Sequence, residues 1–133
     1  SRAVMHASNF GIVVDEVPTG GSISSGAQAL DIAMASKPTA AICFNDLVAL
    51  GVLSRAAELG IRVPEDLSVT GFDDIEFSSF SNPPLTTIRS PQVALGEAAW
   101  RILEGELSGK RENHQPLMVA KVVIRTSTGK SPR

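Results

Sequence analysis

The run LGIRVPEDLSVTGFDD, residues 59–74, constrains the fold more than any other part of the sequence. A glycine that suits the left-handed end of a helix is followed by Pro64, which cannot continue a helix. The mostly apolar segment 67–72 then has the length and composition of a strand that is covered on both faces. Asp73 and Asp74 follow at once. In open parallel α/β sheets ligands bind at the carboxyl ends of the strands, so this run places two carboxylates at a candidate ligand edge.

Apolar strand patterns alternate with helical patterns along the chain. We expect strands at 12–14, 39–44, 67–72, 85–89 and 117–125, and helices at about 26–36, 47–59 and 91–107. The order strand–helix–strand–helix–strand predicts an α/β fold with a mainly parallel sheet and helices on both faces.

Three side chains are expected to cap helices, namely Ser25, Asn45 and Ser90. Residues 3–10 have the pattern of the end of a helix. Residues 126–133 have the composition of a frayed tail.

The composition of the chain excludes several classes of protein and site. A chain of 133 residues is one domain or part of one, and its net charge of -2 argues against a nucleic-acid surface on this piece. The single cysteine, Cys43, lies in an apolar strand pattern, which favours a buried small hydrophobe over a nucleophile and fits a reducing compartment. There is no apolar run of the ~20 residues that a membrane helix needs, no cluster with metal-ligand spacing and no P-loop or Rossmann glycine pattern.

Two polar pairs follow predicted strands. Asn45 and Asp46 follow the strand at 39–44, and Asp73 and Asp74 follow the next strand, so parallel strands bring both pairs to one edge. Amides and carboxylates there suit a hydroxyl-rich or amine-bearing ligand. Helix capping alone for Asn45 and Asp46 and an ordinary turn role for Asp73 remain open alternatives. The acids do not form a catalytic set, because adjacent side chains tend to diverge and no histidine is near them in sequence.

Three apolar side chains, Leu50, Phe77 and Phe80, are not assigned to the core by the pattern. Core filling is one interpretation. An exposed apolar strip that forms a subunit contact is the other.

Three long motifs carry a family resemblance: PTAAICFNDLVALG at 38–51, GIRVPEDLSVTGFDD at 60–74 and PPLTTIR at 83–89. In this order they resemble LacI-family transcription regulators. With the helix around Leu95 and the closing segment that ends in RTST at 125–128, the resemblance covers nearly all of residues 26–128.

The resemblance implies a periplasmic-binding-protein-like fold, in which two α/β lobes enclose a small-molecule cleft and a separate N-terminal headpiece reads operator DNA. Residues 1–133 are then a partial effector-binding and dimerisation domain, the C-terminal lobe, without the headpiece. Segment 91–107 corresponds to a crossover helix that packs in the other lobe, and here it could dock elsewhere, swap between chains or expose its apolar face.

The resemblance also implies roles for residues. Asn45 and Asp73 match effector-contacting positions, and Ser90 matches a position that can line the cleft. Gly21 stands where the family often has an aromatic that stacks on the ligand, so this departure argues against a stacked sugar or base. The positions that match the family's dimer interface are Leu50, Phe77, Phe80 and Ser81.

We therefore expect the ligand-sensing part of a cytoplasmic, homodimeric LacI-type repressor, which binds a sugar or nucleoside-like effector without a cofactor or metal and without catalysis. The effector biases the arrangement of the lobes and so the affinity for operator DNA. Two other hypotheses stay open: a periplasmic sugar-binding protein of the same fold, and an α/β enzyme that uses Asp73.

Overall fold

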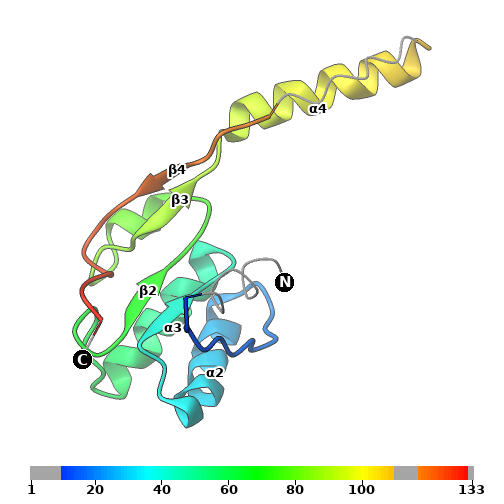
Figure 1. Cartoon of the computed structure of the whole chain (residues 1–133). Coiled ribbons are helices and arrows are strands. Elements are labelled where there is room, and N and C mark those ends of the chain that lie inside the picture. Colours follow the sequence, from blue (N-terminus) through cyan, green and yellow to red (C-terminus); the bar gives the residue numbers. More distant parts are fainter. Residues whose placement is uncertain (1–9, 110–116, 132–133) are drawn as a thin grey trace.

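The computed structural model describes residues 10–109 and 117–131, which form a rounded body and an arm that projects from it (Figure 1). Within these residues no helix is long and apolar enough to cross a membrane. The elements in chain order are α2 (Ile23–Ala33), η1 (Met34–Ser36), β1 (Ala40–Ile42), α3 (Asp46–Glu58), β2 (Ser68–Thr70), η2 (Glu76–Ser79), β3 (Thr87–Arg89), α4 (Gln92–Leu107) and β4 (Lys121–Val123).

The strands form a parallel pair and an antiparallel pair. β1 and β2 run parallel, with Ala41 opposite Val69, and β3 and β4 run antiparallel, with Ile88 opposite Val122. A single parallel bridge between Thr70 and Thr86 links the two pairs, so β3 continues in the direction of β2. The predicted α/β fold is confirmed, and its antiparallel part is the β3–β4 ribbon.

The core lies between α2, α3 and the β1–β2 pair. Helices α2 and α3 approach closely because each has a glycine that lies against the backbone of the other helix. A Cβ on Gly26 would lie 2.1 Å from the carbonyl oxygen of Val48, and one on Gly51 would lie 1.9 Å from that of Ile23. The buried apolar residues are Leu30, Cys43, Val48, Ala49, Val52, Leu53, Ala56, Leu67, Val69 and Leu85.

The described helices cover one face of the sheet. Ala41 and Cys43 pack with the core, whereas Ile42 and Phe44, which alternate with them along the chain, are 89% and 61% exposed. The expected strand at 12–14 is wrong, because these residues form no ladder with a neighbouring strand in the described structure and all three are exposed. An apolar run becomes a strand only when its backbone groups find a pairing partner.

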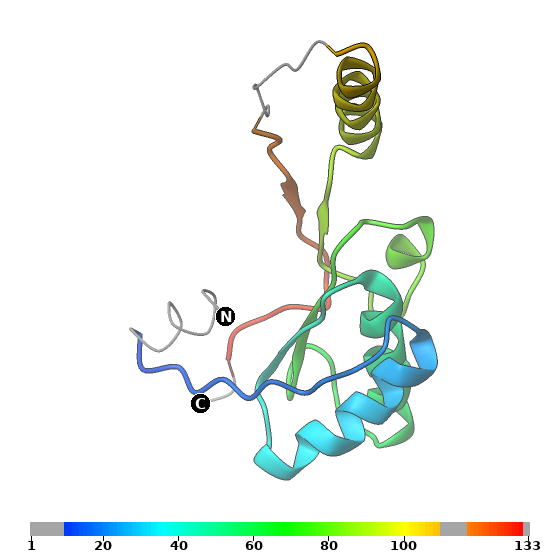
Figure 2. The same cartoon turned by 90° about the vertical axis from the view of Figure 1, so that its right-hand side faces the viewer.

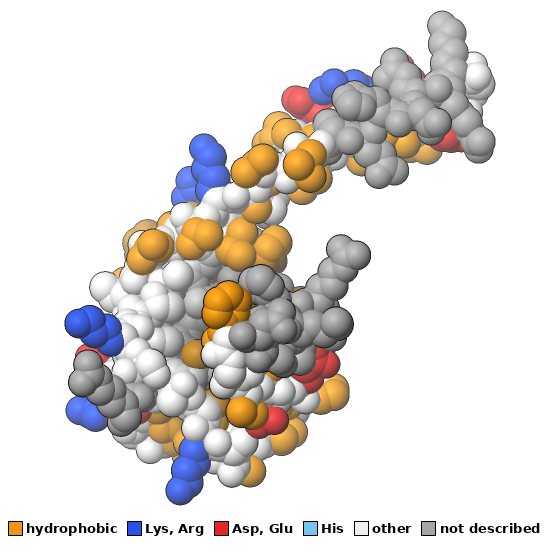
Figure 3. Space-filling view, in the orientation of Figure 1, with side chains coloured by type: hydrophobic (Ala, Val, Ile, Leu, Met, Phe, Trp, Pro, Cys, Tyr) orange, Lys and Arg blue, Asp and Glu red, His pale blue; other side chains and the backbone are white. Residues whose placement is uncertain are grey.

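Helix α4 stands apart from the body. It follows the β3–β4 ribbon outward (Figures 1 and 2), and none of its residues is buried. Val93, Trp100 and Leu107 are 78%, 62% and 78% exposed, and hydrophobic side chains are visible along the arm (Figure 3). In this single chain α4 does not dock on the body, and its apolar face is exposed.

Two predicted caps differ from the observed ones. Ser22 caps α2 and forms a capping box with Ser25, which places Ser25 at the third helical position. The cap position of α4 is Pro91 rather than Ser90, and no side chain caps this helix. The predicted cap of α3 is confirmed, since the Asn45 side chain accepts a hydrogen bond from the backbone N–H of Val48.

The predicted frayed tail is wrong for residues 126–129. Ser127 is fully buried, and its hydroxyl donates to the carbonyl oxygen of Val69 at 2.7 Å and accepts from the backbone N–H of Thr86 at 2.8 Å. Its backbone N–H donates to Pro84 and its carbonyl oxygen accepts from Val69. The segment thus joins the β2 and β3 regions. Most of the expected helix at 3–10 lies outside the described residues, and Gly11 beyond it has the left-handed φ of 71°.

Candidate functional site

The carboxyl ends of β1 and β2 bring two of the predicted site residues to one edge of the sheet. Ile42 is paired with Thr70, and Asn45 and Asp73 each lie three residues beyond that pair. The two strands run parallel, so both chains leave the sheet at the same edge. The parallel register of β1 and β2 therefore places the Asn45 amide and the Asp73 carboxylate at the same edge.

Asn45 is held in place at both ends of its amide. Oδ1 accepts from the backbone N–H of Val48 at 2.8 Å, and Nδ2 donates to the carbonyl oxygen of Gly21 at 3.2 Å. A primary amide has a second N–H and further lone pairs. The side chain thus caps α3 and retains hydrogen-bonding capacity for a ligand. The same contact brings Gly21, another predicted site residue, beside Asn45.

Asp73 sits at the end of β2 in a constrained backbone. Its φ is 110°, and its backbone N–H donates to the carbonyl oxygen of Ile88 at 2.9 Å. Burial raises the pKa of its carboxyl, and the charge of Asp46 raises it further. Among the described residues, none donates a hydrogen bond to this carboxylate. A ligand that donates a hydrogen bond there would relieve an unfavourable local charge.

Ser90 lies beyond β3, close to Asp73. The bond between the Asp73 N–H and the carbonyl oxygen of Ile88 brings the segment just before Ser90 against the end of β2. Because β3 continues in the direction of β2, Ser90 follows the carboxyl end of a third strand. The four predicted ligand residues thus come from three strand ends and the loop before α2.

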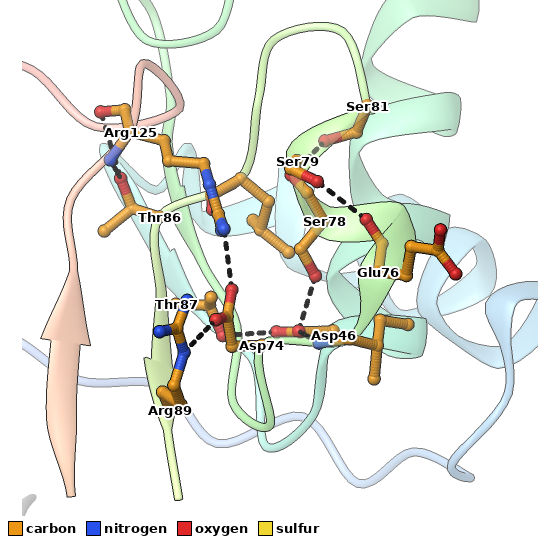
Figure 4. Close-up of polar contacts among 12 residues, drawn as sticks. Asp46, Asp74, Glu76, Ser78, Ser79, Ser81, Thr86, Thr87, Arg89 and Arg125 are labelled. Carbon is orange, nitrogen blue, oxygen red and sulfur yellow. Dashed lines mark hydrogen bonds and ion pairs between the residues drawn. The ribbon is translucent and has the colours of Figure 1, made fainter.

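Asp46 was a candidate for ligand binding from its place after β1, and that expectation is wrong because its carboxylate is buried and used by the fold. It is fully buried and accepts from the Ile75 N–H at 2.9 Å, the Ser78 hydroxyl at 2.5 Å and the Thr87 hydroxyl at 2.5 Å (Figure 4). It therefore ties the start of α3 to η2 and β3. Its hydrogen-bond partners are 29 to 41 residues away in the sequence, so no local sequence pattern predicts them.

Asp74 has a structural role distinct from that of Asp73. Its side chain is 4% exposed and accepts from Nε of Arg89 at 2.5 Å and from Nη2 of Arg125 at 2.7 Å (Figure 4). Burial alone would raise the pKa of this carboxyl, but hydrogen bonds from Arg125 and Arg89 outweigh burial and hold the pKa below its usual value. This acid clamps β3 to the segment after β4.

The predicted subunit-contact residues converge on one hollow of about 340 Å³. Its lining is almost wholly apolar, and Phe77 and Phe80 remain 67% and 78% exposed. The residues that line it are Ile23, Leu47, Leu50, Phe77, Phe80 and Ser81. In residues 10–109 and 117–131, no group of three acids, histidines or cysteines could hold a metal ion.

The comparisons with known proteins agree with this architecture. The family model described as a periplasmic binding protein-like domain matches residues 2–128. The chain belongs to this family, on its LacI-type branch. One curated relative is the HTH-type transcriptional repressor PurR of Vibrio atlanticus, which is 41% identical over 100 residues, 75% of this chain and 30% of that protein. The chain thus spans about a third of the length of such relatives.

Solved structures of LacI-type regulators are similar to this chain. A dimeric Lac repressor with a C-terminal deletion has a TM-score of 0.82 at 32% identity, covering 94% of this chain and 47% of that one. A LacI family regulator of Enterococcus faecium with bound ribose has a TM-score of 0.81 at 26% identity, covering 93% and 48%. These relatives are transcriptional regulators rather than enzymes.

Proposed function

We propose that this chain is the effector-sensing and dimerisation part of a LacI-type transcriptional repressor that acts in the cytoplasm. Residues 1–133 belong to the C-terminal lobe, and α4 is the crossover helix that packs in the other lobe. A separate N-terminal domain binds operator DNA. A small molecule bound between the lobes shifts their arrangement and thereby changes operator affinity.

One observation carries this proposal: Asn45 and Asp73 lie three residues beyond a paired position in adjacent parallel strands. A fixed amide beside an acid without a described hydrogen-bond donor suits a ligand with several hydroxyl or N–H groups. A sugar or a nucleoside-like molecule has such groups. The relative with bound ribose supports a sugar.

The apolar hollow supports the dimer. Two phenylalanines that are more than half exposed, Phe77 and Phe80, line it together with Leu50 and Ser81. Apolar surface of this kind is stabilised when a second copy covers it. The relative described as a dimeric Lac repressor is consistent with this assembly.

Two other functions are less well supported. A periplasmic sugar-binding protein shares the fold, but the relatives reported above are transcriptional regulators. An enzyme that uses Asp73 would turn over its ligand, and Asp73→Asn would abolish turnover while sparing affinity. A sensor has no turnover, and the same substitution lowers affinity.

A thermal-shift screen of the full-length protein against ribose, cellobiose, adenosine and guanine tests the proposal. Ligand at 100 times its Kd stabilises the native state by about 2.7 kcal/mol. We expect at least one compound to raise the Tm and expect Asp73→Asn to reduce that shift. Burial disfavours the charged form of Asp73, so Asp73→Asn should leave the unliganded protein at least as stable at neutral pH.

Asn45→Ser is the matched second variant, because serine also caps a helix well. It retains the α3 cap and removes the amide donor, so it should weaken ligand binding with little loss of unliganded stability. If both variants keep the full ligand-induced shift, the effector does not bind at this edge.

A further inference from the structure

Phe44 is a large apolar side chain that remains exposed at the carboxyl edge of β1. It directly precedes Asn45, and 61% of its surface is accessible. It lies two residues beyond Ile42, and Phe72 lies two residues beyond Thr70, the partner of Ile42 on β2. Phe72 is 37% exposed, so aromatic surface from two neighbouring strands lies at the same edge as the polar site residues.

The loop before α2 lies directly against this ring. A Cβ on Gly21 would lie 3.4 Å from Cζ of Phe44 and 3.6 Å from Nδ2 of Asn45. Because residue 21 is glycine, only its backbone contacts the ring, and no side chain from this position covers the ring face. The Asn45 amide is fixed at the same place by its hydrogen bond to the Gly21 carbonyl oxygen. An aromatic ring, an oriented amide and a position without a side chain therefore adjoin one another.

We propose that Phe44 is the specificity-determining residue of this site and stacks on a flat ring face of the effector. The inference rests on the effector-binding function proposed above and names its ligand class: a ring compound with an apolar or π face and a polar edge. Phe44 holds the face, while Asn45 and Asp73 receive the polar groups at the edge. The aromatic contact comes from the end of β1 rather than from residue 21.

Two kinds of compound share this chemistry. The apolar face of a sugar ring and the face of a purine both pack on aromatic side chains, and both carry hydroxyl or N–H groups at the edge. Stacking of a nucleic-acid base on an aromatic side chain is worth about 1–3 kcal/mol, which corresponds to roughly 5- to 150-fold in affinity.

The test measures Kd by isothermal titration of the full-length protein with ribose, cellobiose and adenosine. Phe44→Leu removes the ring and keeps an apolar side chain, and Phe44→Tyr keeps the ring. We expect Phe44→Leu to weaken the bound compound about 10-fold or more and Phe44→Tyr to stay within about 3-fold of wild type. Gly21→Leu should also weaken binding, because a longer side chain at residue 21 would lie against the ring and cover part of it. Comparing the two sugars with adenosine shows whether the stacked group of the effector is a sugar ring or a purine.

A purely structural role for Phe44 predicts a different result. Phe44→Leu would then lower the Tm of the unliganded protein and leave Kd within about 2-fold, which would overturn the inference. If Asn45→Ser and Asp73→Asn weaken binding while Phe44→Leu does not, the proposed function stands and the stacking role is wrong. If wild type binds none of the three compounds, that result counts against both.

Discussion

Replacing Asp46 by alanine is expected to destabilise the protein severely. The carboxylate is fully buried and accepts three hydrogen bonds, from the Ile75 N–H and the hydroxyls of Ser78 and Thr87. Each buried donor that loses its partner costs about 1–3 kcal/mol. The two hydroxyls can rotate toward other acceptors, so we expect a loss of about 3–5 kcal/mol. A native domain has only about 5–15 kcal/mol of stability in total.

Asp46→Asn provides the graded comparison. An amide oxygen in the place of Oδ2 keeps the bonds from Ile75 and Ser78, and the amide nitrogen can donate to Thr87, whose hydroxyl also accepts. We expect a loss of about 1–2 kcal/mol. Ser79→Ala is the matched surface control, because the Ser79 hydroxyl is exposed and donates only to the Glu76 carbonyl oxygen. It should stay within about 0.5 kcal/mol of wild type.

Urea unfolding followed by circular dichroism measures these differences. Fluorescence is unsuitable, because the single tryptophan, Trp100, lies on the exposed helix α4 and does not report on the body. The m-value should stay constant across the variants if only stability changes. An Asp46→Ala protein within about 1 kcal/mol of wild type would refute the assignment of Asp46 as the group that ties α3 to η2 and β3.

Three further outcomes are expected. Hydrogen bonds from Arg62 lower the pKa of Asp66 to about 2, so this pair stabilises the protein above the unfolded pKa of about 4 and the contribution is lost as the pH falls toward 2; Asp66→Asn should flatten that part of the pH–stability curve. Gly71→Ala should cost about 1–3 kcal/mol in urea unfolding, because its Cβ would lie 2.2 Å from Oδ1 of Asp46, and an unchanged midpoint would show that the site can relax. Phe77→Glu should convert the proposed dimer to a monomer in light scattering, whereas an unchanged mass would exclude the hollow as the interface.

Elements set by local patterns could be predicted from the sequence. The Asn45 cap, the span of α3 and the position of β2 were expected within a few residues. Each depends on residues close by in the sequence. An asparagine precedes the apolar helix, and a glycine followed by a proline separates that helix from the next strand. The convergence of Asn45 and Asp73 follows from the same information, since parallel strands deliver their ends to one edge.

Features that depend on distant partners could not be predicted. Ser127 was expected to belong to a frayed tail, yet it is buried and hydrogen-bonded to Thr86 and Val69, which precede it by 41 and 58 positions in the sequence. Asp46 was expected to cap a helix or to bind a ligand, whereas its role depends on the hydroxyls of Ser78 and Thr87, which reach it through the tertiary fold. The segment 12–14 had a strand pattern but no strand to pair with among the described residues. Composition alone does not supply a pairing partner.

The most direct test of the account is a crystal structure of the full-length protein with its effector bound. We predict that polar atoms of the effector lie within hydrogen-bonding distance of the Asn45 amide and the Asp73 carboxylate at the carboxyl edge of β1 and β2. An effector bound elsewhere, with both side chains turned away from it, would contradict the account.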